Sequence, residues 1–424
     1  RLELFADDYL LGELKGDVRQ QLLLPEPREV VFVADESWEG NTSGYYTVFP
    51  DGDLFRMIYR GWHHDRAKKP AHPEITCYAE SRDGIRWTKP KLGLWEWQGA
   101  RDNNIVRLSG GTHNFTAFRD DNPAAPANAR YKAIGGTGRR GVQAFRSPDA
   151  KHWELMQEER VITNGAFDSQ NLAFWDADRR EYRAYWRYFS DTKVRAIRTA
   201  TSRDFITWEN ETDLGYNDGL PPEHLYTNAI QKYFRAPHLF VGFPTRYEPK
   251  SQQVEPIFMT SRDGRNFHRH AAPVIPRSAP ANRDTNRGNY MVWGMLQLPG
   301  KPNEISVYGT ENYYETTPGR VRRFVYRVDG FVALRGGGHG GQATTKPLHH
   351  AGRKLLLNYV VQPGGALTVE ALDAAGKVVG KSKPLTGDAV DAVVAWDQDP
   401  KLAPGVARLR FALRNADVYS LRFD

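Results

Sequence analysis

The chain of 424 residues has a single cysteine, Cys77. One thiol cannot form a disulfide within the chain, and it excludes a metal site built from several cysteines. No apolar run approaches the roughly 18 residues that a membrane-spanning helix needs, and no long stretch repeats its apolar residues with the 3.6-residue period of a helix. The sequence therefore predicts neither a membrane protein nor a helical protein.

Clusters of like charge are also lacking. The formal net charge is +7 and the isoelectric point is about 9.2, but the Lys and Arg residues are scattered along the chain. A basic surface can attract nucleic acid or another anionic polymer, whereas nucleic-acid binding usually gathers the basic residues on one face. We expect no nucleic-acid partner, no membrane partner and no cofactor, and the oligomeric state stays open.

Aromatic residues, in contrast, are abundant: 11 Trp, 20 Tyr and 20 Phe. They favour strands over helices. Residues 165–188 are an example, because an apolar segment at 172–175, a polar turn, and a segment at 182–188 that alternates aromatic residues with Arg or Ala predict a hairpin. The first strand of this hairpin follows Asp168, Gln170 and Asn171, a polar group that suits the mouth of a pocket.

A short motif recurs along the chain and indicates the fold. It reads Ser-x-Asp, three further residues and an aromatic residue, and its copies start 66, 55, 59 and 66 residues apart, at 81–87, 147–153, 202–208, 261–267 and, in degenerate form, 327–331. Ser or Asp at the head of a turn accepts hydrogen bonds from the backbone that follows. Strands between such regularly spaced turns indicate a repeat architecture, and five repeats of four strands predict a five-bladed β-propeller.

The innermost strand of each blade is expected at 44–49, 113–119, 168–175, 226–233 and 289–298. In a propeller these strands line the central channel, so the residues just before them meet on one face. The candidate binding residues there are Asp35, Trp38, Asn41, His113, Asn114, Gln170, Asn171, His224, Tyr226, Asn228, Arg246, Arg287, Asn289 and Tyr290. Loops between the second and third strands add His63, His64, Arg66, Arg139, Arg140, Tyr247, Glu311 and Tyr313.

The composition changes after residue 331. A glycine-rich linker at 336–341 leads into short alternating strands with Gly-containing turns, a pattern typical of a β-sandwich. We expect an all-β protein with two domains, a five-bladed propeller at 1–335 and a C-terminal β-sandwich at 340–424.

Three carboxylates are expected at the channel mouth: Glu39, Asp168 and Glu223. Glycoside hydrolysis needs two carboxyl groups on either side of the bond, and neighbouring carboxylates push their pKa values apart. Glu223 is the candidate acid, because Pro221, Pro222 and Leu225 surround it with apolar groups. Asp168 is the candidate base or nucleophile, and Glu39 the third group or a replacement for one of the pair.

Each candidate also has a structural interpretation. Glu39 can cap a turn, Asp168 can bind the neighbouring backbone, and Glu223 can pair with Arg246. His113 and His224 fit hydrogen-bonding roles better than metal ligation, since two histidines do not make a metal site.

The repeated Ser-x-Asp hairpins, followed by the C-terminal strands, resemble the five-bladed invertase/levanase-type glycosidases, and the propeller alone is similar to the arabinanase/β-xylosidase type. Residues 35–41 stand where the invertase type has Asn-Asp-Pro-Asn-Gly, and blade two offers His113 and Asn114 where these families have a carboxylate. The resemblance implies a secreted or periplasmic bacterial glycoside hydrolase, its leader removed, that degrades a poly- or oligosaccharide without a metal or other cofactor.

A further expectation concerns the arginines of the face loops, which suit sulfate or carboxylate groups on an anionic glycan; they are Arg66, Arg139, Arg140, Arg246 and Arg287. Other activities stay open because fold does not determine function. They are a non-catalytic glycan-binding propeller, a glycoside phosphorylase or transglycosidase, and, with less support, a lyase.

Overall fold

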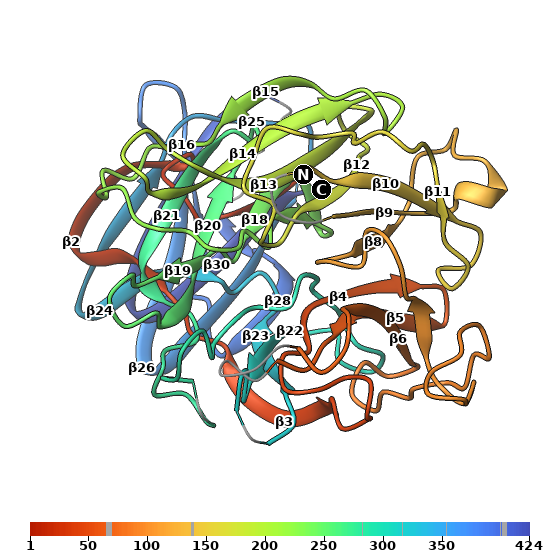
Figure 1. Ribbon diagram of the computed structural model, residues 1–424. Helices are drawn as coiled ribbons and strands as arrows, with labels where there is room; N and C mark the ends of the chain where they lie inside the picture. The colour runs from red at the N-terminus through yellow and green to blue at the C-terminus, as the bar shows by residue number, and fades with distance from the viewer. Residues whose placement is uncertain are drawn as a thin grey trace. The chain divides into compact units, whose positions relative to one another are not determined.

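The computed structural model describes residues 1–64, 70–136, 140–281, 283–315, 317–352, 354–398, 400 and 405–424. Regular structure in these residues consists of strands and one short 3₁₀ helix, Ala127–Ala129 (Figure 1). The chain forms two compact units. One comprises Glu26–Tyr233 and Pro237–Val325, and the other comprises Arg1–Pro25, Phe234–Ala236 and Tyr326–Asp424. No helix in the described residues is long and apolar enough to cross a membrane.

Five sheets, antiparallel except for one short parallel pairing in the fourth, form the blades of a five-bladed β-propeller, which confirms the predicted fold class. Blade one contains β4 (Gly44–Asp51), β5 (Leu54–Gly61), β6 (Ile75–Ser81) and β7 (Ile105–Arg107). Blade two contains β8 (Thr116–Arg119), β9 (Tyr131–Gly135), β10 (Gln143–Ser147) and β11 (Glu154–Leu155). Blade three contains β12 (Leu172–Asp176), β13 (Glu181–Phe189), β14 (Arg195–Ser202) and β15 (Glu209–Asp213).

The last two blades are less regular. Blade four contains β17 (Gln231–Tyr233), β18 (Ala236–Gly242), β20 (Val254–Ser261) and β21 (Asn266–Pro273), with the short strands β16 (Gly215–Tyr216) and β19 (Thr245–Tyr247). Blade five contains β22 (Glu304–Glu311), β23 (Arg320–Arg327) and β3 (Glu26–Val33). Backbone bridges from Met291 to Gly309 and from Leu296 to Ser306 add the expected inner segment of this blade.

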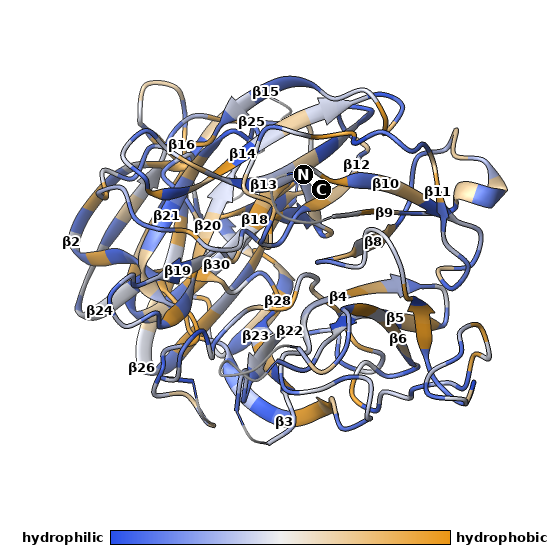
Figure 2. Ribbon diagram, viewed as in Figure 1, coloured by the Kyte–Doolittle hydropathy of each residue, from blue (hydrophilic) through white to orange (hydrophobic). Residues whose placement is uncertain are grey.

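The ring of blades is closed by a strand from the start of the propeller sequence. β3 precedes blade one in the chain, yet it pairs antiparallel with β23 of blade five. The inner segments of blades five and one also meet, because the Val48 amide donates to the Trp293 carbonyl at 2.8 Å and the Trp293 amide donates to the Tyr46 carbonyl at 3.0 Å. Apolar side chains fill the space between neighbouring blades one and two, among them Phe49 and Phe115, and β5 and β6 accordingly appear orange in Figure 2.

The repeated turn has the same hydrogen bonds in four blades. In the first copy, the Ser81 hydroxyl accepts from the Gly84 amide at 2.9 Å, and the Asp83 carboxylate accepts from the Ile85 and Arg86 amides at 2.9 and 2.8 Å. The fourth residue takes a left-handed backbone, with φ of 69° at Gly84. The same conformation recurs at Ala150, Phe205 and Gly264, so the Ser-x-Asp hydrogen bonds hold it even where the residue is not glycine.

The C-terminal unit is a β-sandwich built on one nine-stranded sheet. Its main path runs through β2 (Leu11–Leu22), β24 (Val332–Thr345), β30 (Gly405–Phe423), β26 (Leu355–Leu372), β27 (Val378–Ser382) and β29 (Trp396–Gln398). The strands β1 (Leu2–Leu4), β25 (Leu348–His350) and β28 (Asp388–Val393) pair alongside. The long strands shift register, for example between Val361 and Ala366, and such irregularities let a sheet bend over its own core.

Two features of this unit differ from the sequence expectation. The first 25 residues, which we expected in the propeller domain, lie in the C-terminal unit, where β2 pairs with β24 and β1 with β30; the red β2 therefore lies beside the blue β24 in Figure 1. The expected glycine-rich linker at 336–341 is part of β24. Its glycines allow close strand contact, since a Cβ on Gly336 would lie 2.5 Å from the Leu413 side chain.

Candidate functional site

Residues just before the inner strands tie neighbouring blades together. The side-chain carboxamide of Asn114 in blade two donates to the Ser169 carbonyl of blade three at 2.5 Å. The Ser169 hydroxyl in turn donates to the Tyr226 carbonyl of blade four. Gln170 accepts from the Ala229 amide at 2.8 Å, and Asn228 donates to the Gln170 carbonyl at 3.2 Å. The predicted polar residues Asn114, Gln170 and Asn228 are buried, and their hydrogen bonds hold neighbouring blades together at the mouth of the channel.

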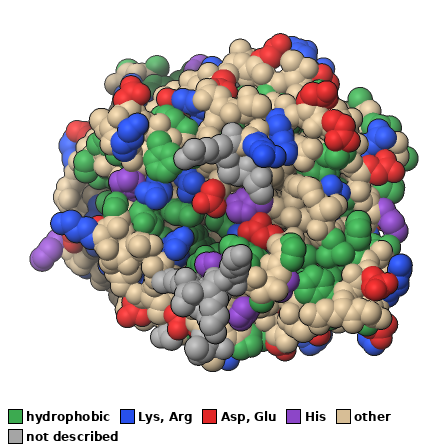
Figure 3. Space-filling model, viewed as in Figure 1, with side chains coloured by type: hydrophobic (Ala, Val, Ile, Leu, Met, Phe, Trp, Pro, Cys, Tyr) green, Lys and Arg blue, Asp and Glu red, His purple; other side chains and the backbone are tan. Residues whose placement is uncertain are grey.

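A cavity of about 680 Å³ opens beside this ring of hydrogen bonds. Four of the predicted residues line it: Asp168, Tyr226, Arg287 and, from the loops between the second and third strands, Tyr247. The rest of its wall is formed by Gly165, Ala166, Phe167, Arg187, Phe189, Arg195 and Gln252. Figure 3 shows acidic, basic and histidine side chains gathered around a hollow near the middle of the visible face.

A second cavity of about 580 Å³ shares Gly165, Ala166 and Phe189 with the first. Phe189 is 44% exposed. It therefore presents an aromatic surface on the border of two adjoining cavities, a position suited to stacking against a ring of a ligand that extends from one cavity into the other.

Asp168 belongs to a chain of three titratable groups. Its carboxylate lies 3.3 Å from Nε2 of His113, and Nδ1 of His113 lies 2.6 Å from the Glu74 carboxylate. The Asp168 side chain is 67% exposed, whereas those of His113 and Glu74 are 12% and 14% exposed. The chain thus runs from a largely buried carboxylate through a histidine to an exposed carboxylate on the cavity wall.

The three groups stabilise one another's charged forms. Burial disfavours the imidazolium, but hydrogen bonds to Asp168 and Glu74 outweigh it and raise the pKa of His113. Burial likewise opposes ionisation of Asp168, but the hydrogen bond from His113 and the nearby Arg187 and Arg60 guanidinium groups lower its pKa. The same balance lowers the pKa of Glu74. Asp168 is therefore held as a carboxylate next to an imidazole that holds its proton well.

Arg60 organises the blade-one side of the channel. Its guanidinium donates to the Tyr313 hydroxyl at 2.6 Å and to Glu74 at 3.3 Å, and it stacks 4.8 Å from the Tyr45 ring centroid. Tyr290 adds a ring 6.4 Å from Tyr45 and 5.9 Å from Tyr313. Burial raises the pKa of both Tyr45 and Tyr290, so these two tyrosines stay neutral and contribute hydroxyl and ring surfaces beside the Arg60 cation.

Glu39 does not face the cavity. Its carboxylate is fully buried, lies 2.7 Å from the Lys89 ammonium and accepts from the Tyr59 hydroxyl at 2.5 Å and from the Glu36 amide at 2.9 Å. Burial raises its pKa against the opposing effect of Lys89. The hypothesis that Glu39 contacts substrate is not supported by this geometry, because every approach is blocked by the side chains that hold it.

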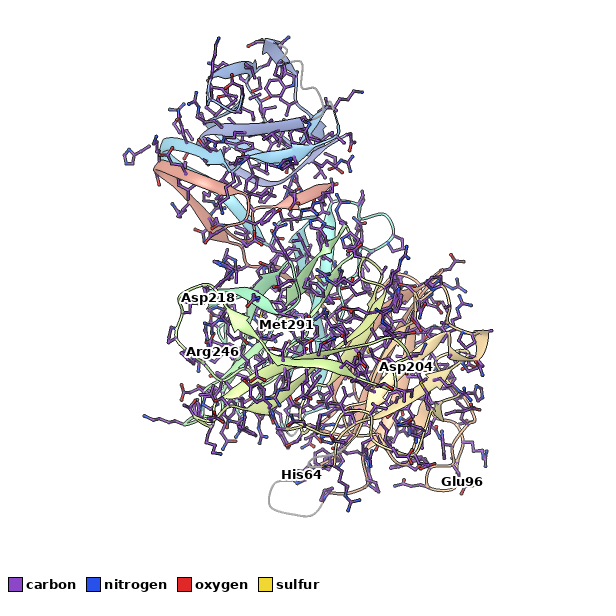
Figure 4. The ribbon with its side chains drawn as sticks, turned by 90° about the horizontal axis from the view of Figure 1, so that it is seen from above. His64, Glu96, Asp204, Asp218, Arg246 and Met291 are labelled. Atoms are coloured by element: carbon purple, nitrogen blue, oxygen red, sulfur yellow. The ribbon has the colours of Figure 1, made fainter. Side chains whose placement is uncertain are left out.

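Glu223 is not among the residues that line the cavity. Its carboxylate binds Arg246 and lies 3.2 Å from Arg269, which in turn holds Asp218 at 2.8 Å. Asp218 and Arg246 lie on the same side of this blade in Figure 4. The expected apolar surroundings of Glu223 are replaced by two guanidinium groups, and the interpretation of Glu223 as one half of an ion pair with Arg246 fits the structure.

Three other predicted residues of blade one serve the loop itself. Asp35 is exposed and lies 2.7 Å from Lys89. The Trp38 indole donates to Asn104 at 2.8 Å, and the Asn41 carboxamide accepts from the His64 amide at 3.0 Å.

Three more predicted residues, Asn171, His224 and Asn289, also form hydrogen bonds within the protein. The Asn171 carboxamide is buried and donates to the Phe167 carbonyl. His224 accepts from the Arg195 amide at 3.2 Å, and burial together with the Arg195 guanidinium lowers its pKa. Asn289 is buried and accepts from Arg283 at 3.0 Å.

The loop residues Arg66 and Arg139 lie outside the described residues, and Arg140 is exposed. The described residues contain no group of three or more His, Cys, Asp or Glu side chains placed to hold a metal ion.

Sequence reasoning missed several residues of the site: Arg60, Glu74, Arg187 and Arg195. Arg187 belongs to β13, the strand in which aromatic residues alternate with Arg or Ala. That alternation predicts a hairpin, and assigning the register of the hairpin would have placed Arg187 near the end of the strand at the channel mouth. Glu74 lies directly before β6, in a loop where the histidines and Arg66 had drawn attention. Nothing in the sequence pairs it with His113, 39 residues away.

No protein-family model matches the chain, and no curated protein matches it. Among solved structures, one described as "Glycoside hydrolase" is similar with a TM-score of 0.49 and 16% identity, over 72% of this chain and 92% of that chain. A family 43 arabinoxylan arabinofuranohydrolase from Bacillus subtilis, in complex with cellotetraose, has a TM-score of 0.46 and 11% identity, over 92% and 97%. An N-acetylgalactosamine deacetylase from F. plautii, in complex with blood group B trisaccharide, has a TM-score of 0.45 and 12% identity, over 93% and 95%.

Proposed function

We propose that this protein cleaves glycosidic bonds in a poly- or oligosaccharide by hydrolysis, at the cavity that Asp168 and Tyr226 line. The observation that carries the proposal is the chain from Glu74 through His113 to Asp168, which ends in an exposed carboxylate on that wall. Such a chain supplies what acid–base catalysis requires, a carboxylate coupled to a group that holds a proton near neutral pH. The aromatic rings around it suit sugar faces.

The site departs from the usual pair of carboxylates. Of the described residues, Asp168 is the single carboxylate that lines the cavity. Hydrolysis needs a second group on the other side of the bond, and a tyrosine takes that part in some glycosidases. Tyr226 is the candidate, because its ring lies against Arg187 and Arg195, 4.8 and 5.6 Å from their guanidinium carbons.

In the first step the phenolic oxygen of Tyr226 bonds to the anomeric carbon as the bond to the leaving oxygen breaks. The Asp168–His113 couple gives a proton to the leaving oxygen and takes the phenolic proton, so it ends the step unchanged. In the second step water displaces Tyr226, and the couple takes a proton from the water and returns one to the phenolic oxygen. Glu74 is a positioning residue, because it holds the histidine ring through Nδ1 and favours its protonated form.

The test is sugar release from a panel of neutral and acidic polysaccharides by wild type, Asp168→Asn, Tyr226→Phe and Glu223→Gln. We expect loss of activity in the first two variants and activity close to wild type in the third, whose carboxylate is bound to Arg246 and Arg269. Circular dichroism and thermal melting check that each variant is folded. Glycan binding without any release by wild type would support a lectin-like propeller instead.

A second candidate reaction is β-elimination by a lyase, and one observation favours it: the cavity combines tyrosine and arginine side chains with a single carboxylate. Product analysis separates the two reactions. Hydrolysis in heavy-oxygen water labels the new reducing end, whereas elimination gives an unsaturated sugar that absorbs ultraviolet light and carries no label.

A further inference from the structure

Arg187 is a buried cation that forms no ion pair in the described residues, although its guanidinium lowers the pKa of the nearby Asp168 carboxyl group. Its side chain projects from β13 and the residue is only 5% exposed. Within the described part of the chain no carboxylate lies within ion-pair distance of it, and its Nε is buried without a hydrogen-bond partner. A buried, unpaired charge is costly, so this position is stabilised when an anion reaches it.

Most other buried arginines of the same unit are paired with a carboxylate; Arg107 is an exception, and its Nε donates to the Gly110 carbonyl at 2.6 Å. Arg283 and Glu311, both fully buried, are 3.0 Å apart, and Arg269 lies 2.8 Å from Asp218. Arg60 has Glu74 at 3.3 Å. The contrast shows that Arg187 is not simply one more structural arginine of a basic protein.

Two further guanidinium groups line the same cavity without a carboxylate partner in the described residues. Arg195 contacts Nδ1 of His224 at 3.4 Å, and burial and Arg195 itself lower the pKa of that histidine, which keeps it neutral. Arg287 donates to the Asn286 carboxamide at 2.9 Å. With three arginines and one aspartate on its wall, the cavity carries a formal charge of 3 − 1 = +2.

The arginines also surround one ring. Arg187 and Arg195 both stack on Tyr226, and Arg195 stacks on Tyr247 at 4.3 Å. Packing of this kind holds planar guanidinium groups in place, so that the N–H groups not already bound to the protein can bind a carboxylate or sulfate in bidentate fashion.

We propose that the glycan bound in this cavity carries an acidic group, a uronic carboxylate or a sulfate ester, which Arg187, Arg195 and Arg287 bind beside Tyr226. The inference deepens the proposed function and names its substrate class. It differs from the expectation built on loop arginines, since of the described members of that set, Arg140, Arg246 and Arg287, only Arg287 lines the cavity. The neutral sugars of the chain then lie toward Asp168 or toward Phe189 and the adjoining cavity.

The test measures binding by calorimetry, with Asp168→Asn protein so that no turnover interferes. The probes are three oligosaccharides of equal length: a neutral one, an oligouronate and a sulfated one. We expect the acidic probes to bind at least tenfold more tightly than the neutral one, with affinity falling as salt rises. Preference for the oligouronate assigns a carboxylate, and preference for the sulfated probe assigns a sulfate ester.

Two variants probe the arginines. Adding Arg187→Met or Arg195→Gln to the Asp168→Asn protein should weaken acidic-probe binding by about ten- to hundredfold, the size expected for a lost charge-assisted hydrogen bond, and leave neutral-probe binding unchanged. Arg146→Gln, which removes a half-buried arginine that pairs with Glu154 at 3.4 Å and does not line the cavity, is the matched control. Arg187→Met should also melt at or above the temperature of its parent, because it removes an unpaired buried charge.

Equal affinity for the three probes, or acidic-probe affinity that survives both arginine variants, would overturn the inference. The outcome is separable from that of the proposed function. Arginine-dependent binding of an acidic glycan without cleavage by wild type refutes hydrolysis and keeps the acidic ligand. Cleavage of neutral glycans that does not depend on the arginines supports hydrolysis and refutes the acidic ligand.

Discussion

Replacing Glu39 tests whether this residue is structural, as its contacts indicate, or catalytic. Glu39→Ala removes the buried partner of Lys89, whose side chain is only 15% exposed, and the acceptor of the Tyr59 hydroxyl and the Glu36 amide. Tyr59 keeps a second contact, because Asn104 donates to its hydroxyl at 2.7 Å. The main loss is therefore the anion facing a largely buried ammonium group.

Breaking a buried ion pair by removing one partner costs about 3–5 kcal/mol. The exposed Asp35 stays 2.7 Å from Lys89 and offsets part of this, so we take the lower end, about 3 kcal/mol. For a unit of this size, a decrease of 1 kcal/mol in the free energy of unfolding lowers the melting temperature by roughly 2–4 °C. Glu39→Ala should therefore melt about 6–12 °C below wild type.

Asp35→Ala is the matched control, because it removes a carboxylate at the same distance from the same lysine. Its side chain is 61% exposed, and exposed pairs contribute about 0–1 kcal/mol, so its melting temperature should fall by less than about 4 °C. Thermal melts and urea unfolding measure both variants. Equal melting of the two variants would refute the burial argument, and a stable but inactive Glu39→Ala would return Glu39 to the mechanism.

Three further predictions concern the site and the ring. In Glu74→Gln the alkaline limb of the pH–activity profile should move to lower pH, because loss of that carboxylate lowers the pKa of His113, whose protonated form the reaction needs; an unmoved limb would mean that another group titrates. Phe189→Ala should lower kcat/KM several-fold for long oligosaccharides and little for disaccharides, since Phe189 borders both cavities; a length series of substrates decides. Gly294→Ala should destabilise the fold by more than about 3 kcal/mol in urea unfolding, because at φ 124° its new Cβ would overlap the Val48 carbonyl of blade one; a wild-type midpoint would contradict this.

The fold could be read from the sequence because its determinants are local. Ser81 and Asp83 accept hydrogen bonds from backbone amides no more than three residues away. Each copy of the motif therefore predicts a turn without information from the rest of the chain. The aromatic residue at the same position of each copy, together with the regular spacing of the copies, then indicates the number of blades. The position of β3 was not readable, because its partner β23 lies at the far end of the propeller sequence and pairing over that distance leaves no local pattern.

The site was readable only in part. Asp168, Tyr226 and Arg287 were expected at the channel mouth and line the cavity. Which carboxylates remain available depends on long-range cations, however: Lys89 is 50 residues from Glu39, and Arg269 is 46 residues from Glu223. A carboxylate beside a strand looks the same in sequence whether a lysine from another loop neutralises it or not.

The strand β3 also determines when the propeller can close during synthesis. Arg28 of β3 contacts Arg322 of β23, 294 residues later, so a ribosome that adds about 5–20 residues per second needs about 15–60 s between making the two. During that interval β3 is an unpaired strand that could associate with other chains. Its first residues, Glu26, Pro27, Arg28 and Glu29, are charged or unable to donate a backbone hydrogen bond. The nascent chain thus carries its own protection against aggregation until the last blade arrives.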